Sequence, residues 1–144
     1  MKIMTIWTPR FLSVLRIVAA LLFLEHGLMK LFHFPIAQPG VPDPLPPMLM
    51  TAGTIELVLG TLLILGLFTR VAAFLASGEM AAAYFLGHLP YGFWPGVNGG
   101  GEAILYCFLF FYIFLAGAGP LSIDALRTVS SESFGKQNGS GPDQ

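Results

Sequence analysis

The sequence predicts an all-α protein of the polytopic membrane class, built as a bundle of four transmembrane helices. Of its 144 residues, 55% are hydrophobic and only 10% are charged, whereas soluble domains carry about 25% charged residues. The apolar residues gather into four runs, each near the ~20 residues with which a helix crosses ~30 Å of hydrocarbon. All eleven prolines lie outside these runs, which favours helices because an interior proline removes a backbone hydrogen bond.

The first apolar run has to be distinguished from a cleaved signal peptide. Arg16 interrupts this run, and Glu25-His26-Gly27 stands where a small-residue cleavage site would be expected. We therefore interpret the run as a retained helix. The four expected transmembrane helices cover residues 11–33, 48–67, 71–89 and 102–118.

The connections between these helices differ in character. Residues 34–47 contain six prolines, which predicts an extended and stiff surface loop. Residues 68–70 form so short a turn that the helices on either side must be antiparallel neighbours. Residues 90–101 combine five glycines with Tyr91, Phe93 and Trp94, which suits an interfacial cap that folds onto the mouth of the bundle.

The distribution of lysine and arginine predicts the orientation. Basic residues precede the first helix, occupy the 68–70 turn and follow the fourth helix, while the other two connections contain none. By the positive-inside rule, both termini and the 68–70 turn face the cytoplasm. We expect residues 1–127 to form the membrane domain, and residues 128–144, rich in Ser, Gly, Asn and Gln, to be a disordered cytoplasmic tail.

The composition excludes several classes of function. A net charge of -1 offers no basic surface to a nucleic-acid partner. The single cysteine, Cys107, can form no internal disulfide and no dithiol relay. No zinc-ligand spacing, phosphate-binding loop or nucleophile motif occurs, so we predict neither a metal site nor soluble-enzyme chemistry. His26 and His88 could ligate a haem, but a lone intramembrane histidine is more often a packing residue.

Each expected helix contains one glutamate. A charged side chain near the bilayer centre costs roughly 2.5–3.5 kcal/mol on insertion scales, so these residues need an explanation. Glu102 opens the fourth helix and suits a first-turn acid that is favoured by the helix dipole. Small residues surround Glu56 and Glu79 on their helical faces, which indicates close packing and carboxyls that point into the bundle. The fourth is Glu25.

Basic partners for these carboxyls lie on the first helix. Arg16, His26, Lys30 and His33 fall in one arc of its surface, with Glu25 beside it. One interpretation is structural, with Arg16 and Lys30 neutralising buried carboxylates. Another follows from depth, because at about 1.5 Å per helical residue most of the polar residues come out in the outward half of the membrane. They could line an outward-facing polar pocket beneath the 90–101 connection, which would suit a quinone-like or lipid ligand. Its candidate residues are Glu25, His26, Lys30, Glu56, His88 and Glu102.

The spacing of charged residues hints at an internal repeat. Arg16 precedes Glu25 by nine residues, and Arg70 precedes Glu79 by the same nine. A glycine also lies three residues before Glu56 and before Glu102. Two similar helical hairpins would explain this spacing.

Five ordered motifs together resemble the DoxX family. They are Arg16 with His26-Gly-Leu-Met-Lys30-Leu31, Glu56-Leu-Val-Leu-Gly60, Gly66-Leu-Phe-Thr-Arg70, Trp94-Pro95 with Gly100-Gly-Glu102, and Gly117-Ala-Gly-Pro-Leu-Ser-Ile-Asp124. The resemblance implies a four-helix bacterial inner-membrane protein, similar to small subunits of thiosulfate or quinol oxidising complexes and to membrane factors for redox or disulfide maturation. It also implies that the polar positions of the family are Glu25, His26, Lys30, Glu56, Glu102 and Asp124.

Three functions remain open from the sequence. The first is an accessory, redox-associated membrane subunit that binds a quinone-like or lipid ligand, rather than a self-contained enzyme. The second is a non-enzymatic scaffold or maturation factor, and the third is a small proton-coupled transporter, since intramembrane carboxylates are frequent in proton pathways. The expected partners are the lipid bilayer, together with redox proteins or a second copy of the chain.

Overall fold

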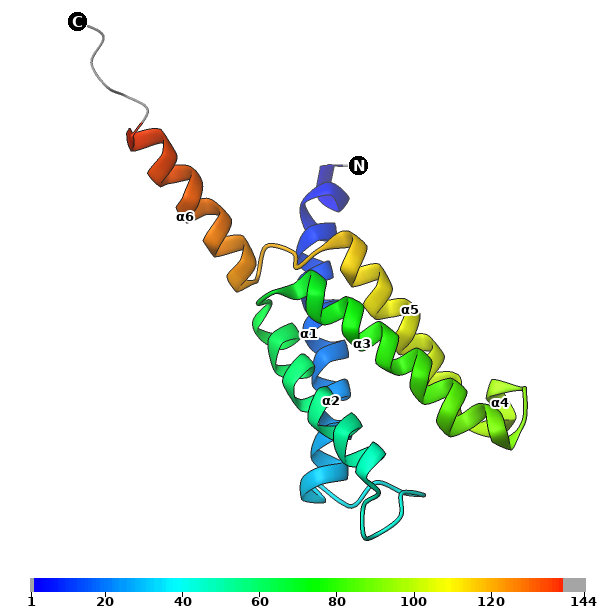
Figure 1. The fold of residues 1–144 in the computed structure, drawn as a ribbon. Coiled ribbons are helices and arrows are strands. Elements are labelled where there is room, and N and C mark those ends of the chain that lie inside the picture. The colour runs from blue at the N-terminus through cyan, green and yellow to red at the C-terminus, as the bar shows by residue number, and fades with distance from the viewer. Residues whose placement is uncertain (1, 139–144) are drawn as a thin grey trace, which may run out of the picture.

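All regular structure in the computed structural model, which describes residues 2–138, is helical, and this confirms the all-α prediction (Figure 1). The elements are α1 (Lys2–Phe32), α2 (Pro47–Leu65), α3 (Thr69–Ala83), a π-helical turn (Tyr84–His88), a 3-10 turn (Leu89–Tyr91), α4 (Pro95–Asn98), α5 (Gly101–Ala116) and α6 (Ile123–Asn138). By length and composition, α1 from Met4 onward and α2 are suited to crossing a membrane, while α5 is apolar but shorter.

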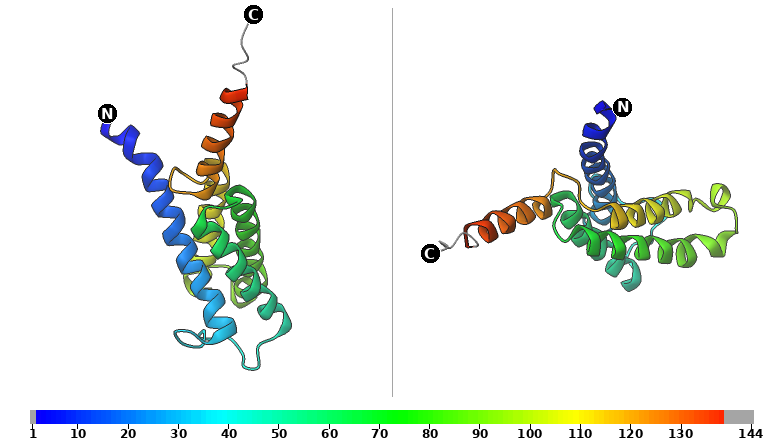
Figure 2. Two further views of the ribbon diagram at one scale, coloured as in Figure 1. Left: turned by 90° about the vertical axis from the view of Figure 1, so that its left-hand side faces the viewer. Right: turned by 90° about the horizontal axis from the view of Figure 1, so that it is seen from above.

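The long helices pair as two hairpins. α1 packs along α2, α3 packs along α5, and α2 contacts α3 to join the pairs (Figures 1 and 2). The turn between α2 and α3 uses Gly66 in the left-handed conformation (φ 65°), which closes the end of α2. α6 leaves the bundle at this same end and projects away from it (Figure 1).

Two helix boundaries differ from the prediction by more than two residues. α1 begins at Lys2 rather than near residue 11 and continues through Pro9, where the proline ring removes one backbone hydrogen bond of this 31-residue helix. α3 ends at Ala83 rather than residue 89, and the chain continues through the π-helical and 3-10 turns to Tyr91. The helical segment from Thr69 to Tyr91 is therefore at least as long as expected, but its last eight residues form π-helical and 3-10 turns instead of α-helix.

A helix also occupies part of the segment that we expected to be disordered. α6 covers residues 123–138, while residues 139–144 lie outside the described part of the chain. Ser122 caps the start of α6 by accepting a hydrogen bond from the Ala125 N–H at 3.1 Å. The prediction of disorder used only the composition of residues 128–144, and the residue that caps this helix lies before them.

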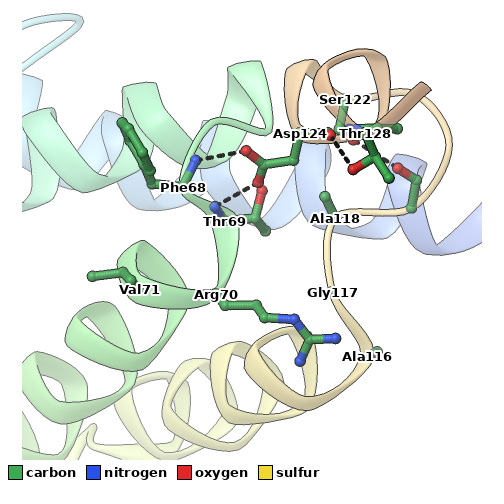
Figure 3. Close-up of a pocket in the computed structure, with 12 residues that line it drawn as sticks. Phe68, Thr69, Arg70, Val71, Ala116, Gly117, Ala118, Ser122, Asp124 and Thr128 are labelled. Atoms are coloured by element: carbon green, nitrogen blue, oxygen red, sulfur yellow. Dashed lines mark hydrogen bonds between the residues drawn. The ribbon is translucent and has the colours of Figure 1, made fainter. Parts of the chain in front are cut away.

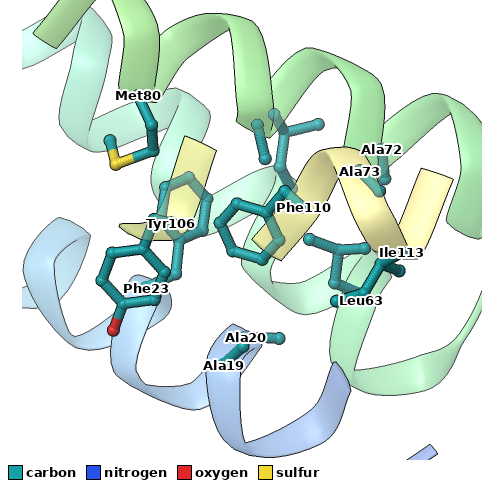
Figure 4. Close-up of a cluster of buried hydrophobic side chains, with 12 residues drawn as sticks. Ala19, Ala20, Phe23, Leu63, Ala72, Ala73, Met80, Tyr106, Phe110 and Ile113 are labelled. Atoms are coloured by element: carbon teal, nitrogen blue, oxygen red, sulfur yellow. The ribbon is translucent and has the colours of Figure 1, made fainter. Parts of the chain in front are cut away.

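The apolar core lies between the two hairpins (Figure 4). Phe23 of α1 meets Phe110 of α5 edge to face, with 4.9 Å between ring centroids. Small side chains on α3 allow the close packing of this region; they are Ala72, Ala73 and Ala76, all buried.

Glycines bring α1 and α2 into close contact. A Cβ on Gly27 would lie 2.8 Å from the Gly53 carbonyl oxygen, and a Cβ on Gly53 would lie 3.2 Å from the Lys30 Cβ. Larger residues would therefore push the helices apart. This close approach places Lys30 next to Glu56.

Part of the internal repeat has a structural counterpart. Arg16 of α1 donates to the carbonyl groups of Leu63 and Ile64, at the end of α2. In the second hairpin, Arg70 donates to the last-turn carbonyls of α5, those of Phe114 and Leu115. In each hairpin, then, an arginine of the first long helix caps the second.

Candidate functional site

The centre of the candidate site is a buried ion pair between α1 and α2. The Lys30 ammonium donates a hydrogen bond to Oε1 of Glu56. The two side chains are only 10% and 2% exposed, which confirms that the Glu56 carboxyl points into the bundle. Breaking one partner of such a pair leaves an uncompensated buried charge.

Glu79 of α3 adds a second carboxyl. Both of its oxygens are buried and have no hydrogen-bond partner among the described residues. The group lies within electrostatic range of Glu56 and Lys30. Two carboxyls thus share one ammonium, so the cluster carries an excess negative charge unless one carboxyl holds a proton. Two like charges in a poorly solvated site repel each other, which favours the protonated arrangement.

His26 and Glu102 connect this centre to the surface. Nε2 of His26 lies 3.7 Å from Oε1 of Glu102, and their side chains are 28% and 62% exposed. Nδ1 of His26 lies 2.9 Å from the Leu22 carbonyl oxygen, to which it can only donate. Nε2 therefore faces the Glu102 carboxylate favourably only when it also carries a proton. Tyr106 of α5 stands edge-on to the His26 ring, at 6.2 Å between centroids.

We refer to His26, Lys30, Glu56, Glu79 and Glu102 as the polar cluster. Its members come from all four long helices, α1, α2, α3 and α5. Four of the six predicted site residues belong to it. Glu79 was absent from the predicted site because its depth placed it nearer the cytoplasmic end of its helix, although the small residues around it had indicated a buried carboxyl.

The other two predicted residues lie apart from the polar cluster. Glu25 is exposed and forms no ion pair with a described residue. His88 lies in the π-helical turn, and its Nδ1 is 3.1 Å from the carbonyl oxygen of Asn98. The aromatic residues of the connection are 70–81% exposed, so they do not close over a pocket as we expected; they are Tyr91, Phe93 and Trp94.

Arg16 forms a separate buried network at the other end of the bundle. Its guanidinium is fully buried, and among the described residues its hydrogen-bond acceptors are all backbone carbonyls. Contrary to the expectation, Arg16 therefore forms no ion pair with a described buried carboxylate and is only within electrostatic range of Asp124, because carbonyls of the last turn of α2 and of the segment after α5 occupy its donors. The acceptors are the carbonyls of Leu63, Ile64 at 3.0 Å, Ala118 at 2.9 Å and Leu121 at 2.6 Å.

Asp124 joins α6 to the start of α3. Its carboxylate accepts hydrogen bonds from the N–H groups of Phe68 at 3.0 Å and Thr69 at 2.8 Å (Figure 3). Burial raises the pKa of Asp124, but the hydrogen bonds from Thr69 and Phe68 and the charge of Arg127 more than offset this, and the pKa lies below its usual value. Asp124 is thus a charged cap at neutral pH.

The two larger cavities that the described residues line lie away from the polar cluster. A cavity of about 420 Å³ lies beside Arg70 and Asp124, and an apolar groove of about 360 Å³ runs between the start of α1 and Tyr112. A third, of only about 20 Å³, lies near Lys30 under the proline-rich loop. Among the residues that the structure describes, no group of three or more His, Cys, Asp or Glu side chains could hold a metal ion.

Comparison with known proteins identifies the family. The DoxX family profile matches residues 11–89, which include α2, α3 and most of α1. A Haemophilus influenzae protein described as uncharacterized is 49% identical over 125 residues, which is 82% of this chain and 91% of the relative. No solved structure matches. The chain therefore belongs to the DoxX family, a bacterial membrane family.

Proposed function

We propose that α1, α2, α3 with its continuation, and α5 all span the inner membrane of a bacterial cell. From Thr69 to Tyr91 the helical path, at about 1.5 Å per residue, can reach across ~30 Å of hydrocarbon. α5 is shorter, but it exposes Leu105 and Phe108 by 73% and 71%, which suits contact with lipid. The distribution of basic residues supports an orientation in which both termini and the turn between α2 and α3 face the cytoplasm.

Labelling of introduced cysteines tests this topology. A cysteine at Gln38, in the loop between α1 and α2, is expected to react in intact cells with a reagent that does not cross the inner membrane. A cysteine at Ser130, in α6, is expected to react only after the membrane is opened. Cys107 is first replaced by serine to remove the native thiol. The opposite pattern would contradict the orientation, and labelling of both positions from one side would contradict the four spans.

We propose that the polar cluster exchanges a proton within the membrane, as part of an accessory subunit of a redox system. The single observation that carries this proposal is the Glu79 carboxyl, which is buried without a hydrogen-bond partner among the described residues and within electrostatic range of the Lys30–Glu56 pair. A structural network would be expected to pair its carboxyls, since an unpartnered buried polar group is costly. A carboxyl that takes up and releases a proton is better left unpaired, because a permanent partner would favour one of its two protonation states.

The arrangement of the cluster supports a route for this proton. Glu102 is the most exposed member, and His26 lies next to it. Glu56 is within electrostatic range of His26 and lies beside Glu79. A proton could pass from Glu102 through His26 to the inner carboxyls, because each of these groups can both accept and donate one.

Infrared difference spectroscopy in lipid vesicles tests the proton site. Raising the pH is expected to remove a C=O stretching band of a protonated carboxyl from the spectrum, and Glu79→Gln should abolish this change. Glu25→Gln is the matched control, because Glu25 is exposed on the neighbouring α1. If the band persists unchanged in Glu79→Gln, Glu79 does not carry the exchangeable proton.

We further propose that a quinone-like ligand binds at the outward edge of this site and serves as its redox partner, with a lipid as the alternative ligand that would only occupy the site. His26 and Glu102 are the members that such a ligand could reach, and each can donate a hydrogen bond to a ligand carbonyl when it holds an additional proton. Quenching of Trp94 fluorescence by a quinone analogue, lost in His26→Ala, would support this ligand. Absence of binding together with a pH-independent infrared spectrum would favour a scaffold, in which the charges only hold the helices together.

A further inference from the structure

The largest cavity described above lies where α3 begins and α5 ends (Figure 3). Its wall includes the Arg70 side chain, the backbone of Gly117 and the first turns of α6. Its volume, about 420 Å³, falls within the range of small-ligand sites. It belongs to neither the polar cluster nor the proton route proposed above.

Arg70 presents unused donors to this cavity. Its Nη1 donates to the carbonyls of Phe114 and Leu115, at 2.7 and 2.9 Å. Its Nε and Nη2 form no hydrogen bond with a described residue. A Cβ on Gly117 would lie 3.3 Å from Nη2 and 3.8 Å from Nε, so the glycine, at φ 90°, leaves this side of the guanidinium open.

The cavity is lined by one arginine, Arg70, and one carboxylate, Asp124, and Arg127 nearby makes the surrounding charge net positive, which favours an anion. The carboxylate of Asp124 is occupied by the N–H groups of Phe68 and Thr69, and Arg70 has no carboxylate in ion-pair contact among the described residues. Arg127 lies close by, stacked on the Phe68 ring at 5.4 Å from its centroid. Arginine is well suited to phosphate because its planar donors can bind two oxygens together.

The rim of the cavity favours a lipid over a soluble anion. Phe68 and Val71 are 57% and 62% exposed, and both line the cavity. Exposed apolar side chains beside a basic pocket suit acyl chains that continue from a charged headgroup. In the proposed topology this end of the bundle lies at the cytoplasmic leaflet, where anionic phospholipids attract basic residues.

We propose that this cavity binds the phosphate headgroup of an anionic phospholipid, held by Arg70 and Arg127. The headgroup phosphate would accept hydrogen bonds from the free donors of Arg70, with Arg127 close by to add its charge. The acyl chains would follow the exposed faces of Phe68 and Val71 into the bilayer. The lipid would thereby join the ends of α3, α5 and α6.

Native mass spectrometry of the detergent-solubilised protein tests the proposal. Palmitoyl-oleoyl phosphatidylglycerol is expected to bind more tightly than the phosphatidylcholine with the same chains. Arg70→Gln and Arg127→Gln should each weaken phosphatidylglycerol binding about fivefold, from roughly 1 kcal/mol per basic residue at a lipid surface. Arg10→Gln is the matched control, because Arg10 is also stacked on an aromatic ring, that of Trp7 at 5.7 Å.

Three outcomes would overturn the proposal. Equal binding of the two lipids would exclude a charged headgroup, and an equal loss in Arg10→Gln would indicate unspecific surface charge. Binding of inorganic phosphate as tight as that of phosphatidylglycerol would assign the cavity to a soluble anion. Arg127 forms no hydrogen bond to α5, so Arg127→Gln carries the test if Arg70→Gln does not fold. Because detergent has no leaflets, a wrong topology or an inactive proton site would leave these results unchanged.

Discussion

Replacing Arg16 by alanine is expected to destabilise the protein by about 3–5 kcal/mol, enough to prevent stable folding of many single domains. The guanidinium is fully buried and donates to carbonyls from the end of α2 and from the segment after α5. Alanine would leave these carbonyls buried without donors and would open a cavity at the junction. The measurement is the free energy of unfolding in a titration with sodium dodecyl sulfate.

Two further variants sharpen the interpretation of this result. Arg10→Ala, on the exposed face of the same helix, should change the stability little, since exposed positions rarely contribute more than about 0.5 kcal/mol. Arg16→Lys should recover only part of the loss, because an ammonium cannot reproduce the planar fork of donors. If Arg16→Ala unfolds with the same free energy as Arg10→Ala, Arg16 does not hold the bundle together.

The role of Arg16 also marks a limit of sequence-based prediction. The sequence showed that Arg16 is charged, how far along its helix it lies, and that its nine-residue spacing to Glu25 is the same as that of Arg70 to Glu79. It did not show that the partners are backbone carbonyls, because every residue has a carbonyl and only the fold determines which ones lack a donor. Helix-end carbonyls are unsatisfied by the helix itself, so an arginine aimed at the end of a neighbouring helix can be recognised only once the pairing of helices is known.

The polar cluster was predicted better than its surroundings. The apolar runs established the helical class, and the small residues around Glu56 and Glu79 indicated which faces point inward. Depth along a helix, by contrast, does not specify the direction of a side chain. Glu25 and His26 differ by one residue, or about 100° around the helix axis. This rotation about the helix axis places Glu25 on the exposed surface and His26 beside Glu102.

The π-helical turn after α3 explains the misplacement of His88. In a regular α-helix through residue 89, the angle about the helix axis between the Glu79 and His88 side chains would follow from their spacing in the sequence. The sequence contains no strong signal for the π-helical turn that changes this angle. In the structure the chain widens from Tyr84, and His88 contacts Asn98 instead. Such turns insert an extra residue into the helix, and this changes the direction in which the side chain of every following residue points.

Replacing Lys30 by methionine is expected to destabilise the protein by about 3–5 kcal/mol, because Glu56 would then be a buried charge without a partner. Glu56 is only 2% exposed, and the second oxygen of its carboxylate has no hydrogen-bond partner among the described residues. The double variant Lys30→Met with Glu56→Met should recover most of this loss, since apolar residues of similar volume can replace a buried ion pair. The measurement is a double-mutant cycle in the same denaturant titration.

The double variant also separates structure from function. It retains Glu79 but removes the ammonium that stabilises a charged carboxyl in the cluster. If the cluster exchanges a proton, the double variant should fold, yet the pH-dependent carboxyl band of Glu79 should titrate at a different pH, because both charges that act on Glu79, those of Lys30 and Glu56, are gone. A single variant that is as stable as the unaltered protein would show that the pair contributes nothing to folding. A stable double variant with an unchanged infrared titration would show that Lys30 and Glu56 are only a structural pair, and the proton site would have to be sought elsewhere.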